Sequence, residues 1–599
     1  MMTDLSSLSF DLGTLQDAYA AGSVTPDAVI SEVYRRIATT GARPVWISLV
    51  PEAEAVARAR RAPKGTLYGI PFAVKDNIDV SGLPTTCACP AFAFTPAKSA
   101  PVVERLEAQG AIVIGKTNLD QFATGLVGVR SPYGIPSSPF DSDFISGGSS
   151  SGSAVSVATG LVSFALGTDT AGSGRVPAAF NNIVGLKPSK GWLSTRGVVP
   201  ACRSQDVISI FALTVRDAAD VMAVAAGYDA KDPYARRAPH PFAVARPPER
   251  LRIGVPESGL EFFGDRDAER LYHASVARLD ANGAEVVAVD YSPFKEAARL
   301  LYSGPWVAER LAAIRRFAET HPDALDSVVG GIILGSADLT AVSAFEGFYT
   351  LADLIRQADA EWAKIDAMLL PTTGTTYRIK DVLGDPVALN SNLGVYTNFV
   401  NLMDLSALAV PAGFRPNGLP FGVTLIGRAF ADGLLAALGD SLHRALDGAE
   451  LGATGKPLAD TRPVEPALPA DRIAVAVVGA HLSGQPLNSQ LRERNARLVS
   501  TTRTAGGYSF YALPGTVPAK PGLVFDGRGA GGIEVEIWEM DAAGFGSFVA
   551  LIPAPLGIGT LTLSDGRQVK GFLCEMHALE GAEDITSYGG WRAYLARAA

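Results

Sequence analysis

Residues 147–175 read GGSSSGSAVSVATGLVSFALGTDTAGSGR, and this stretch places two serine-rich segments around a short apolar core. A serine hydroxyl is a poor nucleophile at neutral pH and needs a base within hydrogen-bond reach. The stretch contains no histidine, and the first histidine of the chain is His240. If these serines carry chemistry, the candidate bases nearby in the sequence are therefore lysine and the carboxylates.

Lys75, in GIPFAVKDNIDV (residues 69–80), is the lysine that best meets this requirement. It follows a β-branched apolar run, which predicts a buried strand and a buried amine. Burial disfavours the charged form of lysine and can lower its pKa by several units. A neutral amine is able to accept a proton, so Lys75 can replace imidazole as the base.

Three short patterns in the chain match known motifs less well than they first suggest. GAIVIGKT (110–117) has Walker A spacing, but its central apolar residues favour a buried strand over a phosphate loop. GSSSG (148–152) fits a nucleophile elbow around Ser150, which requires a histidine, and no histidine has local support. GRGAGG (527–532) precedes an alternating strand instead of the helix that dinucleotide binding needs. We therefore favour a core strand for GAIVIGKT and a loop or hairpin turn for GRGAGG, and we do not assign a histidine-dependent triad to GSSSG.

The length of 599 residues exceeds what one hydrophobic core usually supports, which predicts two domains. Residues 1–62 show helical spacing, and the following part of residues 1–450 alternates short strands with helices, as in an α/β sheet covered by helices. Residues 451–471 contain four prolines and are predicted to form a linker. Residues 472–599 alternate with period two, which indicates a smaller β-rich α+β domain.

Composition and charge exclude several classes of protein. The net charge of −9 disfavours a nucleic-acid partner. We also expect no membrane partner, because no uncharged apolar run of about 18 residues is present. Four cysteines give no disulfide framework, the N-terminal segment lacks secretory features, and no cluster shows metal-ligand spacing. We expect a cytoplasmic protein without metal or other cofactor.

Several motifs together resemble the amidase signature family. They are GIPFAVKDNIDV, GAIVIGKTNLDQFA, SGGSSSGSAVSVATG and LGTDTAGSGRVPAAFNNIVGLKPSKG, with weaker similarity at NLMDLSALAVPAG and LPFGVTLIG. The resemblance covers most of residues 65–430 and implies that family's fold, a mixed central sheet covered by helices. It also implies a catalytic triad in which Lys75 is the base, Ser149 is a bridging serine preceded by a cis peptide bond, and Ser173 is the nucleophile.

The resemblance further implies an oxyanion hole made by backbone N–H groups of Thr170, Ala171, Gly172 and Ser173. Donors aimed at developing negative charge lower the barrier of acyl transfer. Two positions depart from the usual family pattern, namely Ala171 in place of glycine and Gly174 in place of a branched apolar residue. We expect them to reshape the floor of the pocket. The structural alternative is that the serine-rich loop only caps a helix and Ser173 only forms a turn.

A narrower resemblance, to the allophanate hydrolase family, extends over nearly the whole chain. It rests on LLYSGPWVAERLAAI (300–314) and on the tail from AVVGAHLSGQPLNSQL to FVALIPAPLGIGTLTLSDGRQVKGFLCE. Allophanate is urea carrying a carboxylate. The resemblance implies that Tyr302 and Arg310 bind this substrate. Their spacing of eight predicts one face of one helix. Gly125 and Arg130 are further substrate-binding candidates. Without the motif, Arg310 reads as a solvated or ion-paired helix residue.

The reaction implied is hydrolysis of the terminal amide of allophanate, giving ammonia and N-carboxycarbamate, and finally ammonia and carbon dioxide. The chain lacks a biotin-attachment segment, so a separate biotin-dependent urea carboxylase is the expected functional partner, and the family leans toward a homodimer. Alternatives are another amidase-signature amide hydrolase, an amidotransferase subunit acting with tRNA, and a scaffold that binds a urea derivative without turnover.

The tail resembles the second domain of allophanate hydrolases, which has a γ-glutamyl-cyclotransferase-like fold. The resemblance links His481, in GAHLSGQPLN, to the decarboxylation step. The alternative is that His481, a lone histidine after a strand, forms a structural hydrogen bond.

Overall fold

The structure is a computed structural model that describes residues 4–40, 43–248, 250–466, 472–529, 532–564 and 566–597. The chain divides into two compact units, Met1–Ala467 and Leu468–Ala599. We describe each unit by itself and call them the first and the second unit.

The first unit is built on one mixed sheet of eleven strands in the order β1-β3-β2-β4-β6-β5-β10-β11-β9-β7-β8. Strand β2 runs parallel to β3 and β4, and β7 runs parallel to β8 and β9, whereas the other pairs are antiparallel. The strands are β1 Trp46–Leu49, β2 Pro71–Lys75, β3 Ile112–Thr117, β4 Phe164–Asp169, β5 Val184–Lys187, β6 Val207–Ala212, β7 Arg252–Pro256, β8 Glu285–Val289, β9 Ala367–Pro371, β10 Leu405–Phe414 and β11 Pro420–Arg428.

The central strands of this sheet are buried along their whole length, which explains their nearly continuous apolar sequences. Every residue of β2, β3, β4 and β6 is buried. Strands covered on both faces need apolar side chains at successive positions, in contrast to the alternation of a half-exposed strand. The polar ends of these strands, such as Lys75 and Asp169, are therefore carried into the interior.

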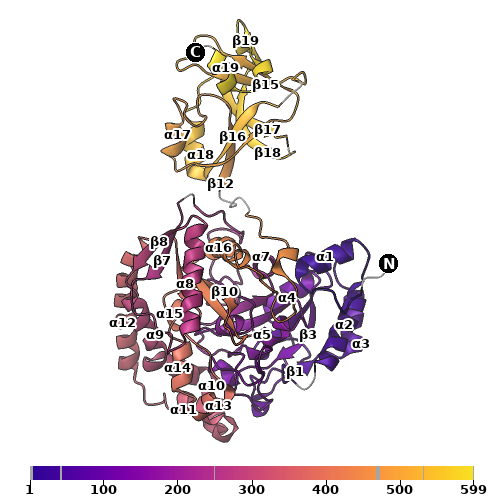
Figure 1. The fold of residues 1–599 in the computed structure, drawn as a ribbon, viewed down its shortest axis with the longest axis vertical. Helices are drawn as coiled ribbons and strands as arrows, with labels where there is room; N and C mark the ends of the chain where they lie inside the picture. The colour runs from indigo at the N-terminus through magenta and orange to yellow at the C-terminus, as the bar shows by residue number, and fades with distance from the viewer. Residues whose placement is uncertain are drawn as a thin grey trace. The chain divides into compact units, whose positions relative to one another are not determined.

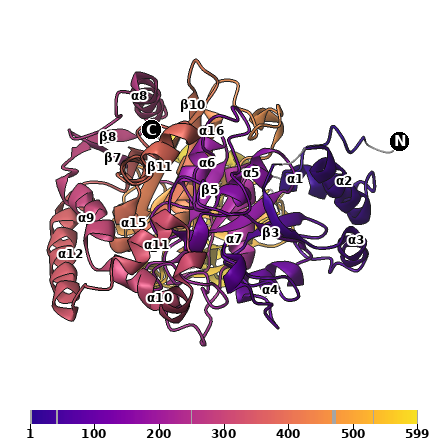
Figure 2. The ribbon, with the colours of Figure 1, turned by 90° about the horizontal axis from the view of Figure 1, so that it is seen from below.

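Helices surround the sheet of the first unit (Figures 1 and 2). Helix α5 packs on β4, α7 on β6 and α16 on β10. Helices α1–α3 lie on the side of β3, and α8, α9 and α12 lie on the side of β7 and β8 (Figure 2). The helices are α1 Leu12–Ala20, α2 Pro26–Thr39, α3 Glu52–Arg60, α4 Pro101–Ala108, α5 Ser151–Ala158, α6 Val176–Phe180, α7 Val215–Ala225, α8 Arg266–Ala281, α9 Ser292–Ser303, α10 Trp306–Thr320, α11 Ser327–Leu334, α12 Ala341–Trp362, α13 Ile379–Gly384, α14 Ala388–Leu393, α15 Asn398–Leu402 and α16 Asp432–Arg444.

The second unit is β-rich and has its own hydrophobic core. A sheet in the order β13-β16-β12-β18-β17 lies with a smaller sheet in the order β15-β14-β19. Its elements are β12 Arg472–Val477, α17 Ser489–Arg492, β13 Arg497–Arg503, β14 Tyr508–Ala512, β15 Pro521–Phe525, β16 Glu534–Asp541, α18 Ala542–Val549, β17 Leu556–Thr562, β18 Gln568–Cys574, β19 Glu583–Asp584 and α19 Trp591–Arg597. The predicted architecture, a helix-covered mixed sheet followed by a smaller β-rich domain, is confirmed.

The proline-rich stretch predicted as a linker packs largely on the first unit. Leu451 and Leu458 are buried in the core of that unit, and the Gly452 N–H donates to the carbonyl of Asn182. The division between the units falls after Ala467. Leu451 and Leu458 thus anchor residues that we expected to connect domains. Residues 467–471 lie outside the described residues.

Candidate active site

Lys75 stands at the C-terminal end of β2, between β3 and β4, and its side chain is fully buried. Its Nζ lies 2.7 Å from Ser149 Oγ and 2.8 Å from Thr168 Oγ1. Thr168 belongs to the neighbouring strand β4. The strand thus delivers an amine to two hydroxyl groups in the interior, and Thr168 is a contact that the sequence analysis did not single out.

Ser149 and Ser173 complete a chain of hydrogen bonds that starts at Lys75. Ser149 Oγ donates to Ser173 Oγ across 3.0 Å, and both serines are buried. The Gly148–Ser149 peptide bond is cis, and α5 begins two residues later at Ser151. The three residues assigned to the triad from the sequence therefore lie in one continuous amine–hydroxyl–hydroxyl arrangement.

The electrostatic environment of Lys75 favours its neutral form. Burial lowers the pKa of Lys75 to about 7, although the nearby carboxylates of Asp120, Asp206 and Asp169 act to raise it. A base is most effective when its pKa lies near the working pH. Burial also lowers the pKa of Lys187 to about 7, but that amine donates to two backbone carbonyls. Geometry, and not the pKa alone, therefore selects Lys75 as the base.

The turn that carries Ser173 connects β4 to α6, and the side chain of Asp169 binds it through hydrogen bonds. The Asp169 carboxylate accepts the N–H groups of Gly172 and Gly174, each at 3.0 Å, and two guanidinium donors of Arg175 at 2.9 Å. Burial acts to raise the pKa of Asp169, but Arg175 beside it outweighs this and lowers the pKa. A charged aspartate therefore fixes the turn that presents the nucleophile.

One of the four predicted oxyanion donors, the N–H of Gly172, is already hydrogen-bonded, in contrast to the other three. The N–H of Gly172 is already bound to Asp169 and has to leave that carboxylate to reach another acceptor. The N–H groups of Ala171 and Ser173 make no hydrogen bond with the residues that the structure describes. Thr170 is oriented by its side chain, which donates to Asp206. Ala171, Ser173 and Thr170 thus face no comparable competition from Asp169.

Gly174 explains one departure from the usual family pattern. A Cβ placed on Gly174 would lie 2.5 Å from Ser209 Cβ and 3.1 Å from Asp169 Cβ. Distances below 3.0 Å require the neighbouring atoms to move, so this position has no room for a branched side chain. Ser209, the nearest residue, belongs to β6.

Asp206 is a buried carboxyl group near the nucleophile that sequence reasoning missed. It accepts a short hydrogen bond from Thr170 Oγ1 and further bonds from the N–H groups of Ala201, at 2.8 Å, and Cys202, at 3.2 Å. Burial raises the pKa of Asp206 to about 6. No motif marks it, because its partner Thr170 lies 36 residues earlier in the chain.

Tyr302 and Arg310 meet, but not as residues of one helix. Helix α9 ends at Ser303, and α10 begins at Trp306, so the prediction of a single continuous helical face is wrong. The reason is the Gly304–Pro305 pair, since proline lacks the N–H that a helix interior requires. Across this break, Arg310 NH2 lies 3.5 Å from Tyr302 Oη, and its guanidinium carbon lies 5.4 Å from the Tyr302 ring centroid.

Arg310 is anchored to the segment that also carries the other substrate-binding candidates. It is only 2% exposed, and its NH1 donates to Thr124 Oγ1 at 3.0 Å and to the Ala123 carbonyl at 3.3 Å. Its Nε has no hydrogen-bond partner among the described residues. A buried guanidinium held by neutral groups alone is suited to bind a carboxylate ligand.

Gly125 and Arg130 lie close to Thr124, the residue that binds Arg310. Gly125 has φ +146°, and a Cβ there would lie 2.7 Å from Asp120 Oδ2 and 3.0 Å from Arg130 NH1. The Arg130 guanidinium donates to the carbonyls of Thr124, at 2.9 Å, and Pro386, at 2.6 Å. Arg130 and Tyr302 line one surface cavity of about 360 Å³.

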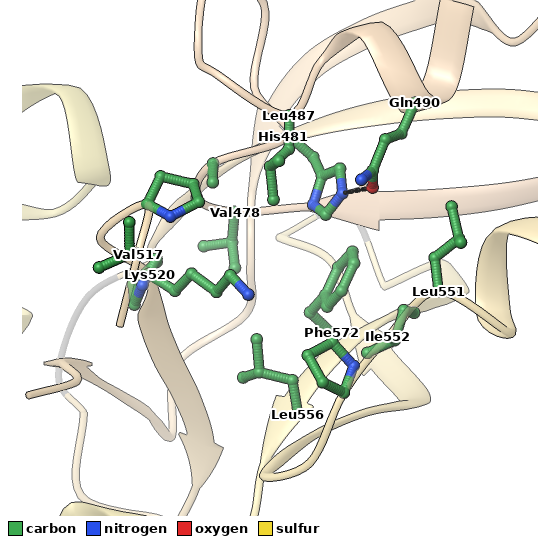
Figure 3. Close-up of a pocket in the computed structure, with 15 residues that line it drawn as sticks. Val478, His481, Leu487, Gln490, Val517, Lys520, Leu551, Ile552, Leu556 and Phe572 are labelled. Carbon is green, nitrogen blue, oxygen red and sulfur yellow. Dashed lines mark hydrogen bonds between the residues drawn. The ribbon is translucent and has the colours of Figure 1, made fainter. Parts of the chain in front are cut away.

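His481 belongs to the second unit, where it follows β12. Its Nε2 lies 3.0 Å from Gln490 Oε1, and its ring stacks on Phe572 with centroids 5.1 Å apart. Phe548 packs edge-on at the same centroid distance of 5.1 Å. The hydrogen bond and the ring contacts fit a structural role, and His481 also lines a cavity of the second unit (Figure 3).

The described residues contain no group of three histidine, cysteine, aspartate or glutamate side chains placed to hold a metal ion. In the same ranges no helix combines the length and apolarity needed to cross a bilayer.

Residues 28–436 match the amidase family, and residues 473–596 match the allophanate hydrolase C-terminal domain. The chain therefore belongs to the amidase family, as the motifs around Lys75, Ser149 and Ser173 predicted.

The combination of the two domains is shared with particular relatives. The chain is 41% identical to a crystallised allophanate hydrolase of Kluyveromyces lactis, with a TM-score of 0.83 over 99% of this chain and 100% of that one. It is 44% identical over 575 residues to the urea amidolyase of Saccharomyces cerevisiae, covering 92% of this chain and 31% of that protein. The urea amidolyase structure of K. lactis matches with 40% identity and a TM-score of 0.83, covering 99% of this chain and 37% of that one. The chain thus spans about a third of the length of its urea amidolyase relatives and has the two-domain architecture of allophanate hydrolase.

Proposed function

We propose that the chain hydrolyses the terminal amide of allophanate through Ser173. The observation that carries this proposal is the hydrogen-bonded chain from Lys75 through Ser149 to Ser173, 2.7 Å and 3.0 Å long in its two steps. The relatives named allophanate hydrolase and urea amidolyase support the choice of substrate.

The geometry supports an acyl-enzyme mechanism. Neutral Lys75 accepts the proton of Ser149 while Ser149 accepts that of Ser173, and the Ser173 oxygen forms a bond to the amide carbon. N–H groups of the turn at Ala171 and Ser173 stabilise the oxyanion. The carbon–nitrogen bond then breaks, the relay returns a proton, and ammonia leaves. Water attacks the acyl-enzyme with the same relay, which frees Ser173 and gives N-carboxycarbamate.

Substrate selection is assigned to the carboxylate of allophanate, which urea lacks. Arg310 offers a buried guanidinium whose Nε is unpaired among the described residues, and Tyr302 adds a hydroxyl beside it. Gly125 and Arg130 form the adjoining wall in this proposal. Charge-assisted hydrogen bonds to a carboxylate are about twice as strong as neutral ones.

The second unit is proposed to act on the product of the first. N-carboxycarbamate carries two carboxylates on one nitrogen. When that nitrogen takes a proton, one carbon–nitrogen bond breaks and carbon dioxide leaves, and repetition of this step gives ammonia and a second carbon dioxide. We assign assistance of this step to His481, whose ring lines a cavity of the second unit.

We further propose a cytoplasmic homodimer that acts after a separate biotin-dependent urea carboxylase. The support is that the urea amidolyase relatives are named for urea and are about three times as long as the match to this chain.

Initial ammonia release from allophanate, urea, malonamide and glutamine by the purified chain tests the proposal. We expect turnover of allophanate with kcat/KM at least 100-fold above the other three, by analogy with the rejection of substrates that leave a polar group of the site unpaired. Turnover confined to malonamide or glutamine would instead indicate another amidase or an amidotransferase subunit. No turnover of any of the four would indicate a binding scaffold.

A further inference from the structure

Asp120 is a fully buried carboxylate that follows β3 and takes no part in the proposed relay. Its two oxygens accept three backbone N–H groups of the loop that comes after it. Oδ2 binds Val127 at 3.2 Å and Gly128 at 3.0 Å, and Oδ1 binds Arg130 at 3.0 Å. Residues 125–130, which we call the wall loop, include both residues assigned to the wall of the substrate site. Asp120 therefore fixes the backbone of that wall.

Asp120 also contacts the segment that carries the bridging serine. The Asp120 N–H donates to the Ser149 carbonyl at 3.1 Å, and the Gly148 N–H donates to the Leu126 carbonyl of the wall loop at 2.8 Å. A Cβ placed on Gly148 would lie only 2.1 Å from Asp120 Oδ2, so the carboxylate packs directly against the residue that precedes Ser149. Hydrogen bonds and packing thus join the wall loop to the bridging serine at Asp120.

The hydrogen bonds of Asp120 favour its ionised form. Burial raises the pKa of Asp120, whereas the Arg130 guanidinium and the backbone N–H groups act to lower it. With the described residues, its carboxylate only accepts hydrogen bonds, which suits the ionised form because that form has no proton to donate. Hydrogen bonds to a charged form stabilise it. The wall loop thus surrounds a buried anion.

This anion influences the base of the relay. Burial lowers the pKa of Lys75, and Asp120 has the largest effect among the charges that oppose this shift. The residue next to Lys75 in the chain, Asp76, is paired with Lys116 at 3.2 Å. Further groups that act to raise the pKa of Lys75 are Asp206, Asp169 and Cys87.

We propose that Asp120 is a positioning residue that joins substrate binding to proton transfer. It holds the wall loop in register with Ser149, and its negative charge makes Lys75 a stronger base. For the wall loop the inference rests on the proposed function, because Gly125 and Arg130 contact allophanate only in that proposal. For the relay it rests on the contacts and the charge of Asp120. Asp120 acts through these neighbours and is assigned no contact with the substrate.

Labelling of Ser173 by a small alkyl fluorophosphonate tests the effect of the charge without allophanate, because the Ser173 oxygen displaces fluoride from phosphorus. The labelling rate of the full chain, followed by intact mass between pH 5 and 9, should rise around the Lys75 pKa of about 7. In Asp120→Asn the anion is absent, so the neutral amine persists to lower pH. The midpoint should then fall by about 1 pH unit, and the kcat/KM profile for allophanate should move with it. An unchanged midpoint would overturn the role of the charge.

Steady-state turnover of allophanate tests the positioning role. Asp120→Asn replaces one acceptor oxygen by an NH2 group, which cannot accept the N–H groups of the wall loop, so KM should rise and kcat should fall, each by about tenfold or more. Asp120→Glu keeps the charge, so the labelling midpoint should stay near 7 while its longer side chain displaces the wall loop and raises KM. The matched control is Asp432→Asn, because Asp432 is an equally buried carboxylate that binds the N–H and the hydroxyl of Ser189. It should lower the unfolding midpoint and leave the labelling midpoint and KM parental.

The outcomes separate this inference from the proposed function. If Asp120→Asn and Asp432→Asn both keep the labelling midpoint and the KM of the parent chain, the inference fails and the proposed function stands. If the Asp120→Asn chain does not fold, Asp120→Glu decides, and a parental KM in that variant overturns the inference. If the parent chain is labelled at Ser173 but does not hydrolyse allophanate, the proposed function fails, and the labelling midpoints still decide whether Asp120 acts on Lys75.

Discussion

Ser149 and Ser173 place their Oγ atoms 3.0 Å apart although 24 residues separate them in the sequence. Helix α5 and strand β4 fill that interval, so the chain leaves the first serine along a helix and returns along a strand to the second. Both elements are buried throughout, and this fixes the two hydroxyls relative to Lys75 on the adjacent strand. Rigid secondary structure on both sides is what a proton relay of this kind requires.

Removal of the base or the nucleophile should stop the first step without unfolding the chain. Ser173→Ala should abolish ammonia release from allophanate, and Lys75→Met should lower kcat by about 10²–10⁴-fold, the usual contribution of a general base. The matched control is Lys187→Met, because Lys187 is equally buried but contacts only carbonyls. It should affect the urea midpoint of unfolding more than kcat. Near-normal kcat in Lys75→Met would require a different base.

The activity should rise with pH through the pKa of Lys75. Its folded-state pKa of about 7 lies below the ordinary value of 10.5, so the reactive neutral amine is lost as the pH falls through about 7. The same depression makes folding less favourable as the pH falls from 10.5 to about 7, since the unfolded chain binds the proton more readily. A profile of kcat/KM between pH 5.5 and 9 measures the activity effect. A flat profile across this range is incompatible with a lysine base.

Asp206 should act by positioning Thr170 in the nucleophile turn. Thr170→Val and Asp206→Asn should each lower kcat by about 10–100-fold, the cost of a small misplacement of catalytic groups, while KM changes little. Thr170→Ser keeps the hydroxyl that donates to Asp206 and should retain most of the activity. Steady-state kinetics of the three variants, with their thermal midpoints, provide the check. A parallel rise in KM, or equal losses in Thr170→Ser and Thr170→Val, would contradict a positioning role.

The strands and the relay were accessible from the sequence, whereas the contacts around them were not. Lys75 could be placed because a buried strand is a local pattern, and its amine has to follow the strand into the interior. Asp206 and Thr124 escaped detection because each acts on a residue far away in the chain, as in the bond between Arg310 and Thr124 across 186 positions. Such partners are set by tertiary packing and leave no periodicity.

The errors of the sequence analysis have equally local causes. Spacing alone placed Tyr302 and Arg310 on one helix, but Gly304 and Pro305 divide that helix in two. The two side chains nevertheless meet across the break, where Arg310 NH2 lies 3.5 Å from Tyr302 Oη. The linker prediction relied on prolines and overlooked Leu451 and Leu458, which anchor the stretch to the first unit.

Loss of the proposed carboxylate partner should weaken substrate binding. Arg310→Met should raise KM for allophanate by about 10–100-fold, the range expected when a charge-assisted hydrogen bond is removed, and Tyr302→Phe should have a smaller effect in the same direction. The matched control on the same helix is Arg315→Met, because Arg315 is exposed and pairs with Glu319. Guanidine-induced unfolding of each variant shows whether stability has changed. Losses of stability that equal the losses of kcat/KM would assign Arg310 to the fold.

His481 should be dispensable for the first step. His481→Ala should release the first ammonia at the parental rate, because Lys75, Ser149 and Ser173 all belong to the first unit. Carbon dioxide should then appear late, because the imidazole that lines the cavity of the second unit is missing. Stopped-flow detection of carbon dioxide beside an ammonia assay measures the two steps separately. The stacking of His481 on Phe572 predicts some loss of stability as well, which His481→Phe should recover by restoring an aromatic contact. If His481→Phe also restores prompt release of carbon dioxide, the ring of His481 serves packing and takes no part in decarboxylation.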